Sequence, residues 1–356
     1  MSKKIVLTGG GTAGHVTPNL ALIPYLKEEG YEIIYIGSYE GIEKRLVADY
    51  DVKYYGVATG KFRRYMDPKN FSDPFRVIKG FAQARKILKE EKPDIVFSKG
   101  GFVSVPVVNA ASALHIPCIL HESDLTPGLA NKLCARSADK ICCNFPETMN
   151  YLPDKKAVLT GTPIRDELMT GNAMTGKNLC GFTDNKPVLM VIGGSLGAQS
   201  VNEVVREALP SILPYFNVIH ICGREKVDNM RLDVPGYKQF EYVKSDLKDL
   251  FALADIVISR AGANSICELL ALRKPNILVP LSKKSSRGDQ ILNARSFEQQ
   301  GFSLVIMPED FDENELVKKI HELYENREEY LVRMTGSGQR GAITTIMKLI
   351  NELSEK

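Results

Sequence analysis

The chain has 356 residues, more than one typical hydrophobic core organises, so we expect two domains. Its 44% apolar and 25% charged residues are ordinary for a soluble globular protein, and a net charge of +3 is too small to indicate a nucleic-acid-binding protein. The seven cysteines form no C-x-x-C pair and fall mostly in expected strands and helices, which indicates reduced core residues and not disulfides or zinc ligands.

The chain opens with a strand, a glycine turn and a helix. Ile5 to Thr8 is a short apolar strand, residues 9–14 are rich in glycine, and Pro18 stands in the first turn of the helix, where proline is favoured. Because the chain enters a strand at once, we expect no signal peptide. The glycines fit G-x-G-x-x-G, but Glu40 is the only candidate for the acidic partner of a dinucleotide site. A nicotinamide or flavin site is therefore disfavoured.

His15 ends this glycine loop, directly before the helix. In an open α/β sheet that position lies at the carboxyl edge, where ligands bind. Histidine titrates near neutral pH, so His15 is our candidate general base. Its alternative role is to cap the loop.

Strand and helix patterns alternate through the first half of the chain. Strands are expected near 53–58, 94–98, 117–121, 139–143 and 157–160, and helices near 41–49, 75–90, 102–114 and 125–136. This alternation predicts a doubly wound parallel sheet.

Two further polar loops follow strands of this sheet. Gly100, Gly101 and Ser104 open a helix, an arrangement that binds anions through exposed backbone N–H groups. Glu122 and Asp124 follow the next strand and are the alternative candidates for the base. Asp124 could instead cap the helix after it.

The segment 61–89 differs from its surroundings because it is both basic and aromatic. It carries nine lysines and arginines against Asp67 and Asp73, and Phe75, Ile78 and Phe81 form one helical stripe. Such a helix can lie on an anionic membrane surface, where each basic residue contributes about 1 kcal/mol. The alternatives are an ordinary helix with a solvated basic face and a nucleic-acid patch. The most apolar long window, 102–120, contains two prolines and is expected to be a buried helix and strand, not a membrane span.

The second half repeats the arrangement of the first. Val188–Ile192 is an apolar strand that ends in Gly193-Gly194, and a helix begins near Leu196, with Ser195 as its cap. The free N–H groups and the dipole of such a helix make an anion site. Further strands are expected near 217–222, 238–242, 255–259, 276–280 and 303–306.

Three polar residues of this half are candidates for ligand contacts. Arg165 follows a Gly161-Thr162-Pro163 linker and supplies a fixed cation. Glu268, early in a helix, could accept hydrogen bonds from two neighbouring sugar hydroxyls or only complement the helix dipole. Gln290 follows a strand at the carboxyl edge.

Two C-terminal features have simpler interpretations. Asp310-Phe311-Asp312 matches the D-x-D pattern of metal-dependent sugar transferases, but it precedes a helix and is expected to cap it, so no metal or other cofactor is predicted. The amphipathic helix 341–353 has no strand after it and is expected to pack back on the first domain.

The motifs together resemble the glycosyltransferases of family 28, which have the GT-B fold. The resemblance covers essentially the whole chain and rests on the segments 9–15, 100–104, 121–122, 161–165, 193–199 and 259–268. It implies two Rossmann-like doubly wound domains facing across a cleft: an acceptor and membrane-associating domain over 1–162 and a donor domain over 163–340, with 341–356 packed on the first. Two departures stand out: Ala13 replaces a usual glycine, and Ser123-Asp124 replaces a common Gln-Asn.

The resemblance also implies an activity and site roles. The activity is inverting transfer of N-acetylglucosamine from UDP-GlcNAc to undecaprenyl-pyrophosphoryl-MurNAc-pentapeptide in peptidoglycan synthesis, at the cytoplasmic face of the cell membrane, by a peripheral enzyme without a cofactor. Thr12, Ala13, Gly14 and Asp124 would meet the donor sugar region, Arg165 and Ser195 the diphosphate, Glu268 the ribose and Gln290 the sugar. Gly100, Gly101 and Ser104 would hold the pyrophosphate of the acceptor.

Other functions remain open at this point. A related lipid glycosyltransferase with a diacylglycerol acceptor and a UDP-GlcNAc 2-epimerase would share the fold and the donor. A non-catalytic sensor would bind UDP-GlcNAc and release nothing. UDP release with and without a polyprenyl-pyrophosphate acceptor separates these functions.

Overall fold

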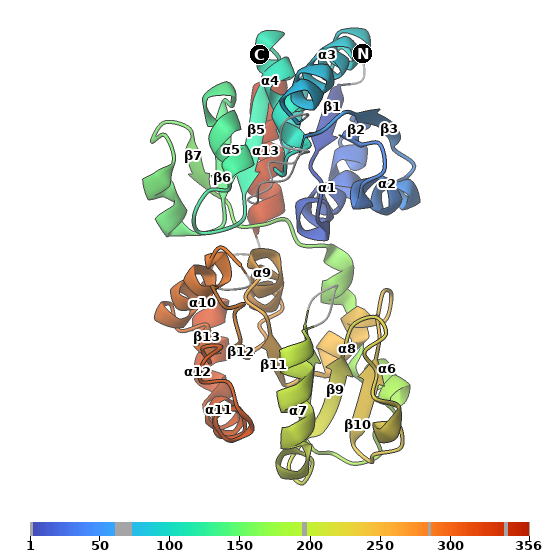
Figure 1. Cartoon of the computed structure of the whole chain (residues 1–356), viewed down its shortest axis with the longest axis vertical. Helices are drawn as coiled ribbons and strands as arrows, with labels where there is room; N and C mark the ends of the chain where they lie inside the picture. The colour runs from blue at the N-terminus through green and yellow to red at the C-terminus, as the bar shows by residue number, and fades with distance from the viewer. Residues whose placement is uncertain (1–2, 61–72, 194–197, 284–285, 338–340, 356) are drawn as a thin grey trace. The chain divides into compact units, whose positions relative to one another are not determined.

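The strands of the first half are short apolar runs whose side chains alternate between two buried faces. The computed structural model describes residues 3–60, 73–193, 198–283, 286–337 and 341–355 (Figure 1). In its first strand, β1 (Lys4–Thr8), Ile5 and Leu7 face one core while Val6 faces the other. This alternation is the strand periodicity of two, and burial on both faces is typical of parallel sheets.

The first sheet has seven strands, and each pair of neighbouring strands is parallel. In spatial order they are β3 (Lys53–Val57), β2 (Glu32–Ser38), β1 (Lys4–Thr8), β4 (Ile95–Ser98), β5 (Cys118–Glu122), β6 (Lys140–Cys143) and β7 (Ala157–Leu159). The order reverses between β1 and β4. The carboxyl ends of these two strands therefore form the switch point at which open α/β sheets bind ligands.

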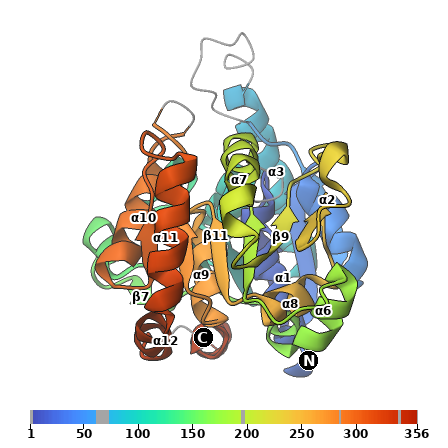
Figure 2. The same cartoon turned by 90° about the horizontal axis from the view of Figure 1, so that it is seen from below.

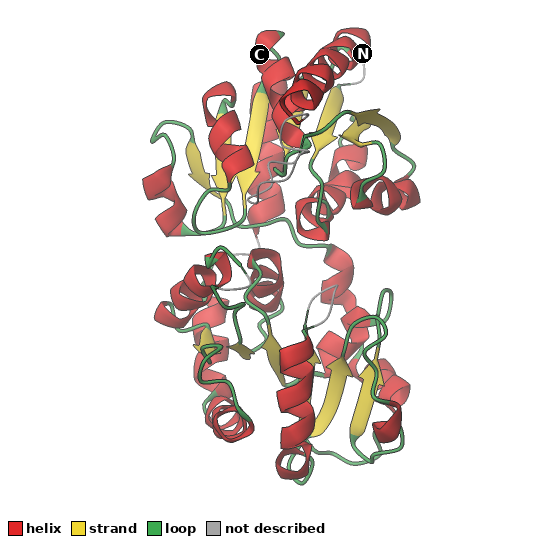
Figure 3. Ribbon diagram, viewed as in Figure 1, coloured by secondary structure: helices red, strands yellow, loops and turns green. Residues whose placement is uncertain are grey.

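Helices cover both faces of this sheet (Figure 3). One face is packed by α3 (Asp73–Glu91), α4 (Ser104–Ala113) and α5 (Leu129–Cys134). The other is packed by α1 (Thr17–Glu28), α2 (Ile42–Val47) and α13 (Ala342–Ser354), the last helix of the chain. Ile346, Met347, Ile350 and Leu353 of α13 share a core with α1 and β1, and the Tyr31 hydroxyl donates to Asn351 Oδ1 at 2.7 Å.

The second sheet has six parallel strands: β10 (Tyr237–Phe240), β9 (Asn217–Ile221), β8 (Val188–Ile192), β11 (Ile256–Ser259), β12 (Asn276–Leu278) and β13 (Ser303–Val305). Its switch point lies between β8 and β11. Helices α7 (Gln199–Ile212) and α11 (Glu313–Glu325) pack together on one face, as Figure 2 shows. The remaining helices are α6 (Ala173–Cys180), α8 (Leu247–Leu253), α9 (Ala263–Ala271), α10 (Asp289–Gln299) and α12 (Arg327–Thr335).

The contacts divide the chain into two units, Met1–Ile164 with Arg340–Lys356, and Arg165–Gln339. The predicted fold class of two doubly wound parallel-sheet domains is confirmed, and the predicted strands agree with the observed ones to within a residue or two. The helix expected over 125–136 begins only at Leu129, because the N–H groups of Asp124 and Gly128 donate to the Glu122 side chain and hold the preceding turn open. All seven cysteines are buried and form no disulfide.

Candidate functional site

Two glycine loops meet at the switch point of the first sheet. Gly101, after β4, has a φ of +82°, and a methyl group on it would clash with the carbonyl oxygen of Gly10, after β1. Both the backbone conformation and this contact require glycine at position 101. The loops 9–15 and 99–104 are therefore packed directly on one another.

His15 closes the first of these loops. Ala13–His15 form a 3-10 turn, and His15 Nδ1 lies 3.0 Å from the hydroxyl oxygen of Thr12. If Nδ1–H donates to Thr12, the lone pair of the ring is on Nε2, which can then accept a proton; the opposite tautomer cannot use Nε2 as a base. Thr12 is exposed, and Ala13, Gly14 and His15 are partly exposed, so a substrate can reach this turn.

The same loop carries a carboxylate that sequence reasoning missed. Glu43, at the start of α2, is completely buried, and its Oε2 accepts the Gly11 N–H at 3.1 Å. The protein's own carboxylate therefore occupies a backbone donor of the glycine loop. In the sequence Glu43 is one acidic residue in the first turn of a predicted helix, and nothing there distinguishes it from a surface residue.

The second glycine loop satisfies much of its own polar surface. The Ser104 hydroxyl donates to the Gly100 carbonyl at 2.8 Å, and the Gly100 N–H donates to Ser98 Oγ at 3.2 Å. Ser104 therefore shapes the turn. Among the described contacts the N–H groups of Gly101, Phe102 and Val103 have no acceptor, which leaves them as donors of this loop that a phosphate can use.

His121 and Lys99 form a buried pair beneath these loops. His121 Nε2–H donates to the Gly161 carbonyl at 2.8 Å, and Nδ1 accepts from the Lys99 ammonium at 2.9 Å. Burial, and then the Lys99 charge, hold the pKa of His121 well below its usual range. His121 is consequently a neutral structural group, and Lys99 donates also to Ser123 Oγ.

Glu122 anchors the loop after β5. Its carboxylate accepts the N–H groups of Asp124 and Gly128 at 3.0 and 2.9 Å and the Asn131 side-chain amide at 2.8 Å. Burial raises the pKa of Glu122. With three donors and almost no exposed surface, Glu122 is better placed to hold the loop than to take a proton from a substrate, whereas Asp124 is partly exposed.

An arginine to which sequence analysis assigned no role lies at the switch point of the second sheet. Arg260 follows β11, donates to the carbonyls of Val279 and Pro280 at 3.0 and 3.3 Å, and reaches Ser200 Oγ in α7 at 2.8 Å. It thereby ties the ends of β11 and β12 to the start of α7. Ser195 lies outside the described residues.

Arg165 and Glu268 are two polar residues of the second unit whose hydrogen-bonding capacity is not filled within the described residues. Arg165 Nη1 pairs with Glu167 at 2.9 Å, but its Nε is buried without a hydrogen-bond partner among the described residues. Burial raises the pKa of Glu268 to about 7, and the charge of Arg165 opposes that rise. Within the described residues, no hydrogen-bond donor is found for the Glu268 carboxylate. A ligand that supplies an anion and two hydroxyl groups would satisfy both side chains.

Gln290 is tied into the backbone. Its Oε1 accepts the Leu281 N–H at 3.0 Å across the turn between β12 and α10. The amide nitrogen of the side chain is the part of Gln290 left to contact a ligand.

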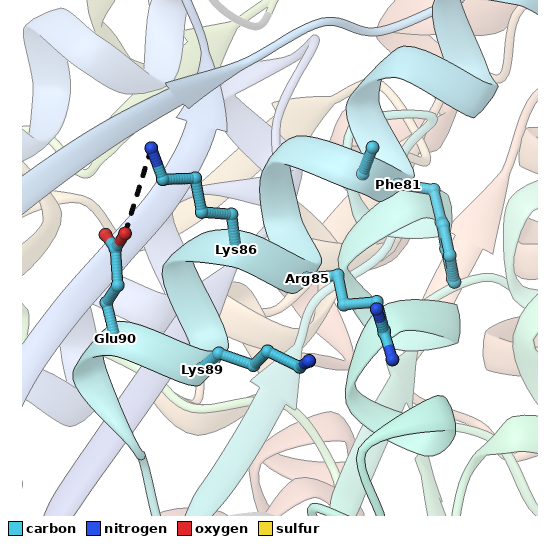
Figure 4. A pocket seen from close by; sticks show the side chains of 6 residues that line it. Phe81, Arg85, Lys86, Lys89 and Glu90 are labelled. Carbon is cyan, nitrogen blue, oxygen red and sulfur yellow. Dashed lines mark ion pairs between the residues drawn. The ribbon is translucent and has the colours of Figure 1, made fainter.

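Of the basic segment 61–89, residues 61–72 lie outside the described residues. The rest of the segment belongs to α3. Gly80, Ala84 and Leu88 are buried, whereas Ile78 is 66% exposed. A hollow of about 420 Å³ on this helix is lined by Phe81, Ala82, Arg85, Lys86, Lys89 and Glu90. Figure 4 shows these side chains on α3.

Within the described residues there is no group of three His, Cys, Asp or Glu side chains that could hold a metal ion. Asp312 caps α11, as predicted, with Oδ1 accepting the Glu315 N–H at 2.8 Å. No helix in the described ranges is both long enough and apolar enough to span a membrane.

Comparison with known proteins decides the family. The N-terminal domain of glycosyltransferase family 28 matches residues 5–143, and the C-terminal domain of the same family matches residues 188–350. The chain belongs to glycosyltransferase family 28. The family 28 fold seen here resembles the crystal structure of Acinetobacter baumannii MurG, with a TM-score of 0.79 and 25% identity over 98% of this chain and 99% of that one.

Family 28 relatives of known name match over their whole length. Proteins from Lachnospira eligens and Lachnoclostridium phytofermentans are 59% and 60% identical, over 99% of this chain and 100% of each relative. Both are named UDP-N-acetylglucosamine–N-acetylmuramyl-(pentapeptide) pyrophosphoryl-undecaprenol N-acetylglucosamine transferase.

Proposed function

We propose that this chain transfers N-acetylglucosamine from UDP-GlcNAc to the 4-hydroxyl of MurNAc in undecaprenyl-pyrophosphoryl-MurNAc-pentapeptide. The observation that carries the proposal is the 59–60% identity to transferases of that name along the full length of both chains. The pair Arg165 and Glu268 supports it, because a nucleoside diphosphate offers the anion and the two ribose hydroxyls that these side chains lack.

The proposed reaction is a single inverting displacement. The muramoyl oxygen forms the new bond to the anomeric carbon, the bond from that carbon to the diphosphate oxygen breaks, and UDP leaves with the electron pair. His15 Nε2 accepts the hydroxyl proton while Thr12 orients the ring, and this base contributes about 10²–10⁴-fold. Negative charge develops on UDP, and each fixed donor there contributes roughly 3–4 kcal/mol.

The remaining predicted residues take binding roles in this proposal. Arg165 and Ser195 meet the diphosphate, and Glu268 accepts from the ribose. Glu122 holds the loop that presents Asp124. The donor sugar is met by Thr12, Ala13, Gly14, Asp124 and the Gln290 amide, and the acceptor pyrophosphate by Gly101, in a turn shaped by Gly100 and Ser104.

The proposed acceptor is a lipid, so the enzyme must work at a membrane surface. We propose that α3 makes a peripheral contact with anionic lipid at the cytoplasmic face, with exposed Ile78 among Arg85, Lys86 and Lys89. Nucleic acid is not a proposed partner.

UDP release tests the function. The purified enzyme is given UDP-GlcNAc with no acceptor, with a polyprenyl-pyrophosphoryl-MurNAc-pentapeptide, or with diacylglycerol. We expect release only with the second, together with a disaccharide product. Release without any acceptor indicates an epimerase or hydrolase, and release with diacylglycerol indicates the alternative lipid transferase.

A further inference from the structure

Glu43 connects three segments of the first unit through one buried carboxylate. Its Oε2 accepts the Gly11 N–H at 3.1 Å, and its Oε1 accepts the Ser38 N–H at 2.9 Å together with the Ser38 hydroxyl. Gly11 lies in the loop after β1, Ser38 ends β2, and Glu43 itself begins α2. The two oxygens therefore accept three hydrogen bonds, and two of these come from backbone N–H groups, which can only donate.

Glycines make the space that this carboxylate fills. A methyl group on Gly10 would lie 2.5 Å from the carboxyl carbon of Glu43, and one on Gly41 would clash with both carboxylate oxygens. The φ of Gly10 lies outside the left-handed region, so the Glu43 carboxyl and not the backbone conformation demands glycine there. The loop is therefore built around the carboxylate.

The loop that Glu43 holds leads directly into Thr12 and His15. Gly10, on the other side of Gly11, packs its carbonyl against Gly101 of the second glycine loop. A shift of Gly11 therefore moves the turn that carries His15 and disturbs the contact between the two loops.

We propose that Glu43 is a positioning residue for the transfer reaction, which fixes the glycine loop so that His15 meets the acceptor hydroxyl. The inference rests on the proposed function for its kinetic part. Its structural part, the placement of residues 9–16, is measurable without turnover.

The variant E43Q keeps the size of the side chain but replaces the carboxylate by a neutral amide. The amide has an NH₂ group in place of one carboxylate oxygen. This NH₂ group would face a backbone N–H, and since two donors cannot hydrogen-bond to each other, the loop must move. A misplacement of about 1 Å costs on the order of 10²-fold in rate. We expect kcat to fall tenfold to a hundredfold and the Kd for UDP to stay within twofold, because Arg165 and Glu268 belong to the other unit.

The control is D139N in the same unit. Asp139 also accepts a backbone N–H, that of Cys118 at 2.8 Å, but at the amino end of β5. Amide hydrogen exchange in residues 9–16 of the ligand-free protein should quicken at least tenfold in E43Q and remain unchanged in D139N, which should also keep its kcat.

Two results would overturn the inference: exchange in residues 9–16 that is unaltered in E43Q, or an equal loss of kcat in D139N. If the wild-type enzyme transfers no sugar, the proposed function is wrong, but the placement of residues 9–16 by Glu43 is still tested by the hydrogen-exchange measurement. If E43Q does not fold, S38A removes one of the three donors and keeps the charge. Faster exchange confined to residues 9–16 then supports the inference, and a uniform or absent change overturns it.

Discussion

The charge of Arg165 lowers the pKa of Glu268, yet burial raises it more, so that this carboxyl titrates at about 7. The two side chains come from different segments, Arg165 before the short helix at 166–170 and Glu268 from α9. The Glu268 carboxyl therefore changes its charge within the physiological pH range, and we expect the proposed donor site to bind in a pH-dependent way.

Binding of UDP should weaken as the pH falls through 7. The ionised Glu268 carboxylate offers both oxygens to the ribose hydroxyls, whereas its protonated form keeps one as a donor. We expect the Kd for UDP to be constant above pH 8 and to rise up to tenfold for each pH unit below 7. Calorimetric titration between pH 5.5 and 8.5 measures this. E268Q should bind more weakly, with a flat profile, and an equally steep profile in E268Q would assign the titration to another group.

The substitution Arg165→Ala should move this titration upward. Without the guanidinium charge, only burial acts on Glu268, and its pKa rises further. We expect weaker UDP binding with a midpoint displaced to higher pH, whereas Arg165→Lys should keep the midpoint near that of wild type. A midpoint that Arg165→Ala leaves in place would contradict the coupling.

The ligand-free enzyme should lose stability between pH 4.5 and 7 because of Glu268. The folded-state pKa lies above the unfolded value of 4.5, so the favourable contribution is complete below pH 4.5 and disappears as the pH rises through 7. The loss is about 1–3 kcal/mol. E268Q should therefore unfold at a higher temperature than wild type at pH 8. Thermal unfolding at pH 8 checks this, and a lower Tm for E268Q there would be the opposite result.

His15 and Glu122 should be separable by their effects. We expect H15A to lower kcat by about 10²–10⁴-fold, and T12V, which removes the oxygen beside Nδ1, by about tenfold, both with unchanged Tm. E122Q should instead lower the Tm, because three N–H groups donate to the Glu122 carboxylate and at least one of them would then face the NH₂ group of the glutamine. A near-normal kcat in H15A would rule out His15 as the base.

Charge reversal on α3 should release the enzyme from membranes without harming its chemistry. We expect R85E/K86E/K89E to bind vesicles containing 30% phosphatidylglycerol at least tenfold more weakly at low salt, with kcat on a soluble acceptor analogue unchanged. K155E/R224E/K318E makes the same change of charge on exposed residues elsewhere and should bind normally. Equal weakening in both variants would indicate a net-charge effect.

Local patterns were sufficient for the fold but not for the polar interior. Apolar runs such as Val188–Ile192 predict parallel strands, and glycine pairs predict the turns after them. Both patterns can be recognised because they depend only on residues that are neighbours in the sequence. The contacts of Glu43, Glu122 and Lys99 depend on segments tens of residues apart that meet only after folding. Glu122 was therefore interpreted as a possible base, and Glu43 was overlooked.

The helix α13 has a consequence for how the chain can be divided. The first unit needs both ends of the polypeptide, because the hydrophobic side chains of α13 complete the core of β1 and α1, whereas the second unit is one continuous insertion between them. A fragment that stops at residue 164 would expose that apolar surface to water and should aggregate. Fusing residues 341–356 behind residue 164 through a short glycine-serine linker should restore a first unit that folds on its own, and we expect residues 165–339 to fold when expressed alone.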